Sequence, residues 1–149
     1  MIDRLPVTQA VATMLAAASG KPVGRGARPI GVEPPYYLLT VVSTDVSGAP
    51  LADDSEDLSI VYQVTAVTGP APSTAGSYAV ADQADWLADK ARAAFLARDP
   101  DTGQWLHPIT VTGARVIARR LDSEPGGSRD DSDAIINNVQ RFRLDLTPS

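Results

Sequence analysis

An alternating stretch followed by a long amphipathic segment constrains the fold of this chain more than any other feature. Between Leu58 and Thr68, apolar side chains take every second position and share one face: Leu58, Ile60, Tyr62, Val64 and Ala66. This period of two is typical of a strand with one buried side. After a Gly/Pro/Ser/Thr linker over 69–76, apolar residues recur at helical spacing and predict a helix over 77–98 that lies on a sheet. This regular unit carries no catalytic residue, so we expect the function to lie in surfaces and loops.

The rest of the chain follows the same two periodicities. A helix is predicted over 4–19, with Asp3 as its N-cap and Gly20 as its stop. The other expected segments are a loop over 20–35, a strand over 36–42, an acidic loop over 44–57, a strand within 104–122, a polar loop over 123–136 and a last strand over 139–146. The order α-β-β-α-β-β predicts an α+β two-layer sandwich, in which helices pack on one face of a mostly antiparallel sheet.

Size and charge narrow the class of protein. The 149 residues fit a single domain over 1–149, with long loops at 44–57 and 123–136. A net charge of −5 argues against a protein that grips nucleic acid by its phosphates, because such proteins are usually basic. Disulfide and thiol chemistry are excluded, since the chain has no cysteine. The sequence shows no secretory signal and no membrane-spanning stretch, so we expect a protein made and used in the cytoplasm.

Enzymatic signals are weak. The single histidine, His107, lacks the partners of a zinc site or of a nucleophile triad, and is expected to be a structural or surface residue. The glycine-rich segment from Gly20 to Gly26 lacks the spacing and the Gly-Lys-Ser/Thr ending of a phosphate-binding loop. No general acid–base pair stands out. The sequence therefore predicts a protein without catalytic residues, cofactor or metal.

Two acidic segments are candidate binding sites. The first holds Asp53, Asp54, Glu56 and Asp57; the second holds Asp130, Asp131 and Asp133. Crowded oxygen ligands suit a hard cation, but neither segment follows the spacing of an EF-hand loop. Solvated loop charge and contact with a basic partner surface are the alternative interpretations.

Four arginines occupy two predicted strands. Arg115 and Arg119 are expected to share one strand face, and Arg141 and Arg143 share a face of the last strand. If these strands are neighbours, the four form a basic stripe. Three interpretations remain open: a wetted outer face with local ion pairs, an interface with the acidic loops of an adjacent copy, and a nucleic-acid contact, which the acidic total disfavours.

Several short motifs, taken in their order and spacing, carry a resemblance to a known family. They are Tyr-Tyr-Leu-Leu (36–39), Pro-Leu-Ala-Asp (50–53), Val-Tyr-Gln-Val-Thr-Ala-Val (61–67), Gln-Ala-Asp-Trp-Leu-Ala-Asp-Lys-Ala-Arg (83–92), Arg-Leu-Asp-Ser-Glu-Pro-Gly-Gly-Ser-Arg-Asp-Asp (120–131) and Val-Gln-Arg-Phe-Arg-Leu (139–144). From about residue 5 to residue 147, the chain resembles the tail terminator proteins of long-tailed phages, in the form found in phages of actinobacteria.

The resemblance implies a non-enzymatic virion protein. Members of that family form a hexameric ring at the head-proximal end of the tail, which caps the tail tube, stops its growth and presents a surface to the head-completion proteins. The implied partners are therefore further copies of the chain, the major tail tube protein and a stopper protein, while phage DNA passes through the lumen without being read. No cofactor and no membrane are implied.

The distribution of charged residues fits a ring-forming protein, and two alternative functions stay open. A ring needs heterologous contacts, which acidic loops and arginine-bearing strands offer, and excess negative charge keeps a lumen from gripping DNA. We expect Arg129, Asp130 and Asp131 to lie in a loop that contacts a neighbour or the tube, because Pro-Gly-Gly flexibility stands beside charges of both signs. Another head–tail connector is the nearest alternative, and a small-molecule-binding regulatory α+β module is a more distant one.

Overall fold

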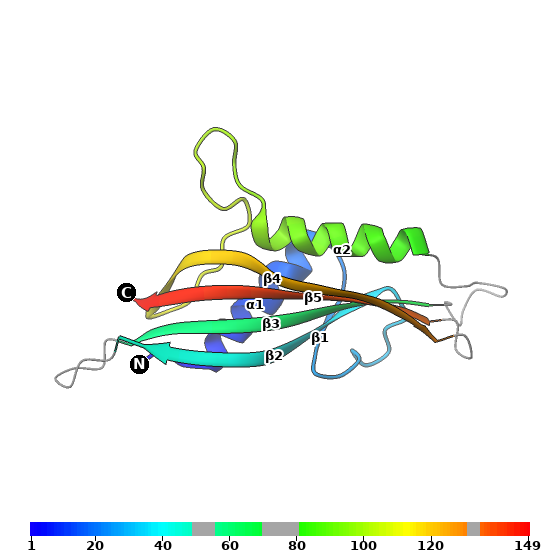
Figure 1. Ribbon diagram of the computed structural model, residues 1–149, viewed down its shortest axis with the longest axis horizontal. Helices are drawn as coiled ribbons and strands as arrows, with labels where there is room; N and C mark the ends of the chain where they lie inside the picture. The colour runs from blue at the N-terminus through cyan, green and yellow to red at the C-terminus, as the bar shows by residue number, and fades with distance from the viewer. Residues whose placement is uncertain (49–55, 70–80, 131–134) are drawn as a thin grey trace.

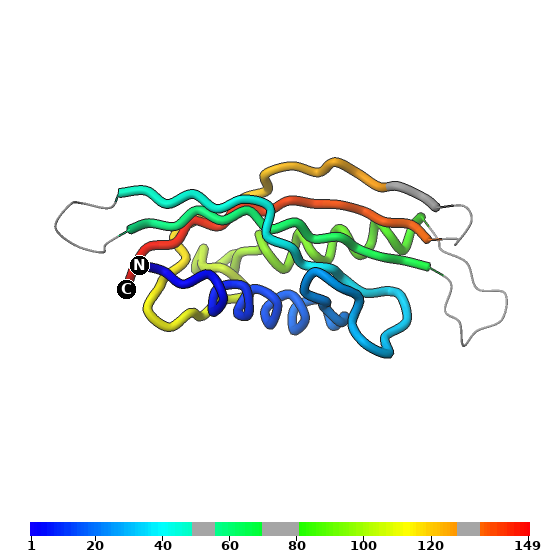
Figure 2. The backbone as a smooth tube through the Cα atoms, turned by 90° about the horizontal axis from the view of Figure 1, so that it is seen from below, coloured from blue at the N-terminus to red at the C-terminus, as the bar shows by residue number. Residues whose placement is uncertain are grey.

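The chain folds into two layers, a five-stranded sheet and a pair of helices (Figure 1). The computed structural model describes residues 1–48, 56–69, 81–130 and 135–149, with only the backbone of 128–130. Its elements are α1 (Arg4–Ser19), β1 (Val23–Arg25), β2 (Tyr36–Ser47), β3 (Asp57–Thr68), α2 (Ala81–Leu96), β4 (Ala114–Asp130) and β5 (Ile135–Pro148). Both helices lie on the same side of the sheet (Figure 2). The predicted α+β class, with helices on one face of a mostly antiparallel sheet, is confirmed.

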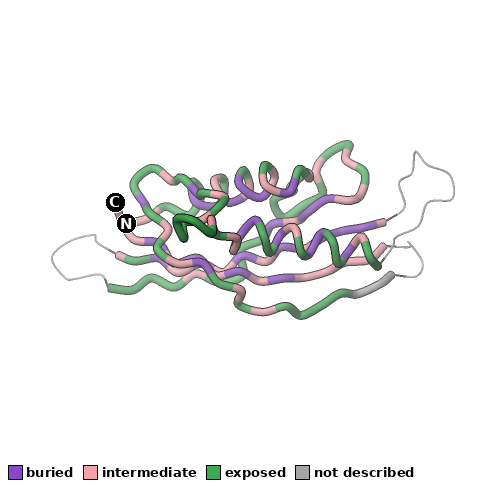
Figure 3. The backbone as a smooth tube through the Cα atoms, turned by 90° about the horizontal axis from the view of Figure 1, so that it is seen from above, coloured by how far each residue is buried: buried purple, intermediate pink, exposed green. Residues whose placement is uncertain are grey.

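The sheet has the strand order β1-β2-β3-β5-β4. β1 runs parallel to β2, and every other pair is antiparallel. The C-terminal strand β5 therefore lies between β3 and β4, with long registers on both sides. This placement makes β4 one edge of the sheet, while the outer half of β2, beyond its pairing with β1, forms part of the other edge. Exposed residues run along both of these edges (Figure 3).

The hydrophobic core lies between the sheet and the two helices. The alternating face predicted for the central strand is buried as expected: Leu58, Ile60, Tyr62, Val64 and Ala66. Facing it are the predicted stripe of α2 and the buried positions of α1: Ala84, Leu87, Ala88, Ala91, Ala94 and Phe95, with Val7, Val11, Met14 and Leu15. β5 contributes the predicted Phe142, Leu144 and Leu146, each fully buried. Such interdigitated burial is the main stabilising contribution to the fold.

Two tyrosine hydroxyls tie the helices to the sheet. The Tyr37 hydroxyl in β2 donates a hydrogen bond to the backbone carbonyl of Leu87 in α2, with 2.5 Å between the oxygens. The Tyr62 hydroxyl in β3 shares a hydrogen bond of 3.0 Å with the Thr8 hydroxyl in α1. Each ring fills the core while its polar end is satisfied, as buried tyrosines require. These two hydrogen bonds therefore join each helix to a different strand.

The first helix has the predicted bounds. Gly20 adopts φ 70° at its C-terminal cap and donates its N–H to the Ala16 carbonyl at 2.9 Å, the left-handed ending that glycine allows. Asp3 occupies the N-cap position, but its side chain makes no capping hydrogen bond. The sequence therefore predicted the correct ends of the helix but not the form of its N-cap.

The predicted polar loop over 123–136 is wrong in most of its length. β4 runs to Asp130 and β5 begins at Ile135, so these residues largely form a β-hairpin. The Glu-Pro-Gly-Gly sequence is typical of a turn. In β4 it forms part of a strand, because an edge strand tolerates Pro125 and because shifts in the register between Leu121 and Gly126 accommodate the extra residues. Gly127 is required in this strand, because a Cβ there would stand 2.8 Å from the Asn137 carbonyl oxygen.

Several other boundaries also differ from the prediction. β2 extends to Ser47, which narrows the predicted loop over 44–57, and residues 49–55 lie outside the described residues. The short strand β1 occupies part of the predicted loop over 20–35. The strand predicted within 104–122 begins at Ala114, after an irregular excursion over 97–113, but continues to Asp130. β5 runs over Ile135–Pro148, beyond the predicted 139–146, and α2 ends at Leu96 rather than at residue 98. The strand ends that project beyond the helices have exposed side chains on both faces, so they lack the alternation that reveals a strand.

Candidate subunit interface

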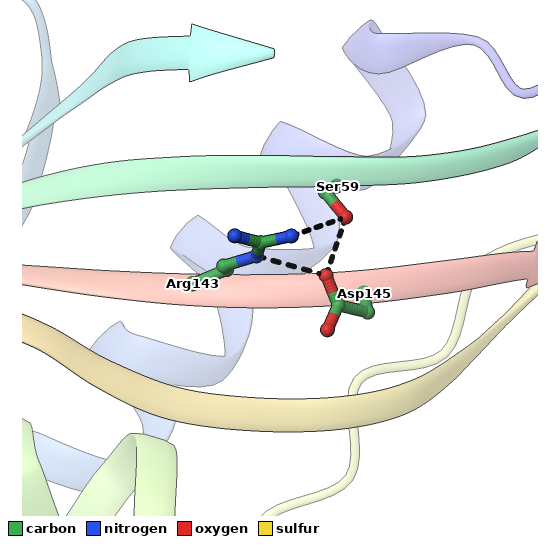
Figure 4. A network of polar contacts seen from close by, with 3 residues as sticks. All are labelled: Ser59, Arg143 and Asp145. Carbon is green, nitrogen blue, oxygen red and sulfur yellow. Dashed lines mark hydrogen bonds and ion pairs between the residues drawn. The ribbon is translucent and has the colours of Figure 1, made fainter. Parts of the chain in front are cut away.

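The sheet face that the helices leave uncovered carries a polar network. We define this open face by Ser59, Gln63, Arg120, Arg141, Arg143 and Asp145. Ser59 donates to Asp145 Oδ1 at 2.5 Å, Arg143 Nε donates to the same oxygen at 3.1 Å, and Arg143 Nη2 donates to Ser59 Oγ at 3.1 Å (Figure 4). Arg141 Nε donates to Gln63 Oε1 at 3.2 Å. These contacts join β3 to β5 across the open face.

The charges of the open face act on Asp145. Partial burial raises the pKa of this carboxyl. The hydrogen bonds from Ser59 and Arg143, together with the positive charges of Arg143 and Arg120, lower it by more than burial raises it, so the net shift of the pKa is downward. Arg120 stands opposite Arg143 in the register of β4 and β5. Arg120 was not predicted, because an undisturbed alternation from Arg119 puts it on the other strand face.

The predicted pairing of Arg115 and Arg119 on one strand face is wrong. A register shift between Val116 and Ala118 inserts a residue into β4 and reverses the alternation after it. Arg115 is exposed, whereas Arg119 is only 7% exposed and lies opposite Leu144 on the helix side. The strands that carry the four arginines are neighbours, as the stripe requires. Arg115, opposite Thr147, lies on the open face with Arg141 and Arg143, and Arg120 takes the place predicted for Arg119.

Arg119 is held inside the protein by backbone and aromatic contacts. Its Nη1 donates to the carbonyl of His107 at 2.8 Å and to the carbonyl of Phe95 at 3.3 Å. Its guanidinium lies over the Trp105 ring, 4.8 Å from the ring centroid, and Arg98 lies 3.8 Å from the same centroid. Burial, and then the charge of Arg98, lower the pKa of Arg119 to about 10. The guanidinium Nε is buried without a hydrogen-bond partner among the described residues.

A pocket of about 290 Å³ opens beside this arginine. Its lining combines Arg119 and Arg115 with Trp105 from the excursion over 97–113 and with the apolar Ile109 and Val116. The excursion is held by backbone hydrogen bonds, among them one from the N–H of Leu106 to the carbonyl of Ala97 at 2.9 Å. The pocket therefore places the Arg119 guanidinium against an apolar and aromatic wall.

The acidic candidates lie at two separate places. Glu56 is half-buried and Asp57 is exposed at the start of β3, while Asp53 and Asp54 lie outside the described residues. The backbone of Arg129 and Asp130 belongs to β4 and pairs with Ile136 and Ile135. The side chains of these two residues, and the whole of Asp131, lie outside the described part.

Glu56 and Asp57 lie far along the sheet from the backbone of Asp130. Leu58, next to Asp57, pairs with Leu146 near the end of β5, whereas Arg129 pairs with Ile136 near its beginning. Within the described ranges, no three histidine or carboxylate side chains gather in a way that holds a metal ion. No helix in those ranges is long and apolar enough to cross a membrane.

Comparison with known proteins identifies a shared fold. No family model matches the chain, and no curated protein matches it. Among solved structures, it is similar to a chain from a structure described as the virion of a native gene transfer agent particle, with a TM-score of 0.59 and 16% sequence identity. The match covers 95% of this chain and 94% of that chain. At this level of identity, the likeness shows that the two chains have the same fold over nearly their whole lengths.

Proposed function

We propose that this protein is a structural component of a phage-like particle and acts as a tail terminator. In this role, copies of the chain assemble into a ring, a hexamer in the resembled family, at the head-proximal end of the tail. The ring caps the tail tube, stops its polymerisation and offers an attachment surface to the head connector. Its partners are further copies of itself, the tail tube protein and a head-completion protein.

The shared fold with a chain of a virion particle is the observation that carries this proposal. The match extends over 95% of the chain, so it is not limited to a small common substructure. The order of the sequence motifs points to the same class of protein from an independent direction. A fold alone does not define a function, so the charge distribution supplies the second support.

The distribution of charge suits head-to-tail assembly. Exposed carboxylates stand at the β2–β3 end of the sheet, and arginines stand on β4 and the open face of β5, so one copy offers two different and complementary patches. Two different patches make a heterologous contact, which closes into a ring when the rotation between copies is right. The net charge of −5 repels the phosphates of DNA, so DNA would pass through the lumen of the ring without being bound.

The described polar groups support a structural rather than an enzymatic role. Arg119, the most buried arginine of the candidate set, donates to two backbone carbonyls, and the Tyr37 and Tyr62 hydroxyls join the two layers. These contacts hold the fold together. We therefore propose a virion protein that acts through its shape and its surface.

Measurement of mass in solution tests the assembly. Light scattering over a range of concentrations, followed by electron-microscopic class averages of any assembly, is expected to reveal a closed ring with one copy number. A chain that stays monomeric at all concentrations and also on purified tail tubes would contradict the proposal. Normal tails that fail to join heads in its absence would favour a stopper protein, and a thermal shift with a metabolite would favour a small-molecule-binding module.

A further inference from the structure

We infer that the pocket beside Arg119 binds a carboxylate, and that a second copy of this chain presents it from the acidic edge formed by Asp45, Glu56 and Asp57. The second part of this inference rests on the proposed assembly, whereas the first part does not. The pocket lies at the β4 edge of the sheet, outside the polar network of the open face. Three observations support the inference: the lining of the pocket, the Nε atom of Arg119 that has no hydrogen-bond partner among the described residues, and the position of the acidic edge.

Arg119 is a buried cation without a counter-charge in the described chain. No carboxylate of those residues pairs with it, and the other charge that acts on it is that of Arg98, which repels it. A buried charge without a partner is costly, so such a group is normally paired or neutralised. A bound anion would remove that cost and also relieve the repulsion between the two arginines that contact Trp105.

The free atoms of Arg119 favour a carboxylate. Both of its hydrogen bonds use Nη1, while Nε is buried and has no partner in the part of the chain that is described. A guanidinium accepts a carboxylate best along one side of its planar fork, through two parallel N–H···O bonds. Its two hydrogen bonds and its contact with Trp105 hold the guanidinium in place before a ligand arrives.

The pocket also suits a side chain carboxylate more than a free inorganic anion. Its volume of about 290 Å³ exceeds the space of a single carboxylate, and its walls include Trp105, Ile109 and Val116. Such walls accommodate the aliphatic part of an Asp or Glu side chain and its backbone. Arg115 is exposed and contributes to the lining of the same pocket, while its register opposite Thr147 places it on the open face.

The acidic edge of the same chain lies at the matching height on the opposite side of the sheet. Leu58 pairs with Leu146, and Leu146 pairs with Val116, which lines the pocket. Asp57 precedes Leu58 directly, and Asp45 lies opposite Ser59 on β2. The strand order puts β2 and β4 on opposite sides of β3 and β5. Asp45 and Asp57 lie on the open face and the pocket lies on the helix side, so a copy that is displaced sideways and offset by the thickness of the sheet brings its acidic edge towards the Arg119 pocket of its neighbour.

The first experiment tests the pocket without any assembly. Nε–Hε resonances of arginine are recorded by NMR on the isolated chain, the Arg119 signal is assigned from its loss in Arg119→Lys, and sodium acetate is added with sodium chloride at equal ionic strength as the control. A saturable shift of the Arg119 signal with acetate alone is expected. No shift, or the same shift with chloride, would overturn carboxylate binding in this pocket.

The second experiment tests the second copy as the source of the carboxylate. The exposed pair Asp57→Lys and Arg115→Glu avoids the buried contacts of Arg119, so both variants are expected to fold. Each alone should weaken assembly at least about tenfold, as the loss of a close charge pair does, and the double exchange should restore it. Asp82→Lys, an exposed change on α2, is the matched control and should assemble as the unchanged chain does.

The outcomes separate the inference from the proposed function. Assembly that is normal in both single variants, or a double exchange that fails to rescue, would overturn the acidic edge as the partner and leave the proposed function intact. A parent chain that forms no assembly under any condition would overturn both the proposed function and this choice of partner. The acetate titration would then still decide whether the pocket binds a carboxylate.

Discussion

The ring of Phe142 in β5 lies parallel to the ring of Phe95 in α2, with 4.2 Å between the ring centroids and 2° between the planes. Both rings are fully buried. This contact joins α2 to the buried face of β5, to which Phe142 belongs. Parallel aromatic pairs contribute to stability beyond the apolar area that they bury, so the pair is expected to govern the docking of the helix.

Truncation of this pair should strongly destabilise the protein. Phe95→Ala is expected to lower the free energy of unfolding by about 3–5 kcal/mol, because it leaves a cavity in a close-packed core. Denaturation in urea measures the change. Leu106→Ala, at a position that is 52% exposed, is the control and should change stability by less than about 0.5 kcal/mol. Equal effects of the two substitutions would show that α2 does not dock on β5 through this ring.

The Tyr37 hydroxyl should contribute a measurable part of the contact between α2 and the sheet. Tyr37→Phe removes the hydrogen bond to the Leu87 carbonyl but keeps the ring, so a loss of about 0.5–1.5 kcal/mol is expected in urea denaturation. Tyr36→Phe is the matched control, because that ring is also buried and its contact with the Arg28 guanidinium involves the ring face. A larger loss in Tyr36→Phe would contradict this role of the Tyr37 hydroxyl.

Stability should fall at alkaline pH because of buried tyrosines. Burial raises the pKa of Tyr62 to about 12, against the lowering effects of the Thr8 hydrogen bond and the Arg25 charge. A tyrosine with a raised folded pKa stabilises the fold below its unfolded value of 10.0 and loses that contribution as the pH rises towards 12. Burial shifts the pKa of Tyr37 in the same direction.

Measurements on variants at alkaline pH test whether stability falls in this way and whether Tyr62 causes the fall. Each buried tyrosine that ionises only on unfolding contributes a slope of about 1.4 kcal/mol per pH unit. Urea midpoints for Tyr62→Phe, measured at several pH values above 10.0, should therefore fall about half as steeply as those of the unchanged chain. A slope that stays the same in the variant would exclude Tyr62 as a source.

The Asp145 carboxylate should stabilise the fold at neutral pH and lose that effect in acid. Its folded pKa is lowered, so its contribution is present above the unfolded pKa and disappears as the pH falls through the folded value. Asp145→Asn is expected to cost about 1 kcal/mol at neutral pH and to flatten the acid side of the stability profile. The exposed Asp122→Asn is the control. A profile for Asp145→Asn that runs parallel to that of the unchanged chain would contradict the network of the open face.

Elements with a regular apolar pattern could be predicted from the sequence. The buried face from Leu58 to Ala66, the stripe of α2 and the alternation of β5 were all confirmed, because burial on one side imposes a period that survives in the sequence. The helix ending at Gly20 was also predicted, since a left-handed cap favours glycine. These features depend on local geometry and on one uniform environment.

The features that were missed depend on interactions between distant segments. The β-bulge before Arg119 is set by the pairing of β4 with β5, and it alone sends this arginine into the core and Arg120 onto the open face. The strand through Pro125 and Gly127 has the composition of a turn and forms only because it is an edge strand beside Asn137. No local pattern reveals either event. The pocket at Arg119 depends on that bulge and was therefore also beyond prediction.

Tail length is the most direct test of the proposed role. Tails assembled from tube protein with and without this chain are imaged by electron microscopy, and the distribution of their lengths is measured. Tails of one length that end in a ring are expected when the protein is present, and overlong tails without that ring when it is absent. Equal length distributions in the two samples would contradict the account.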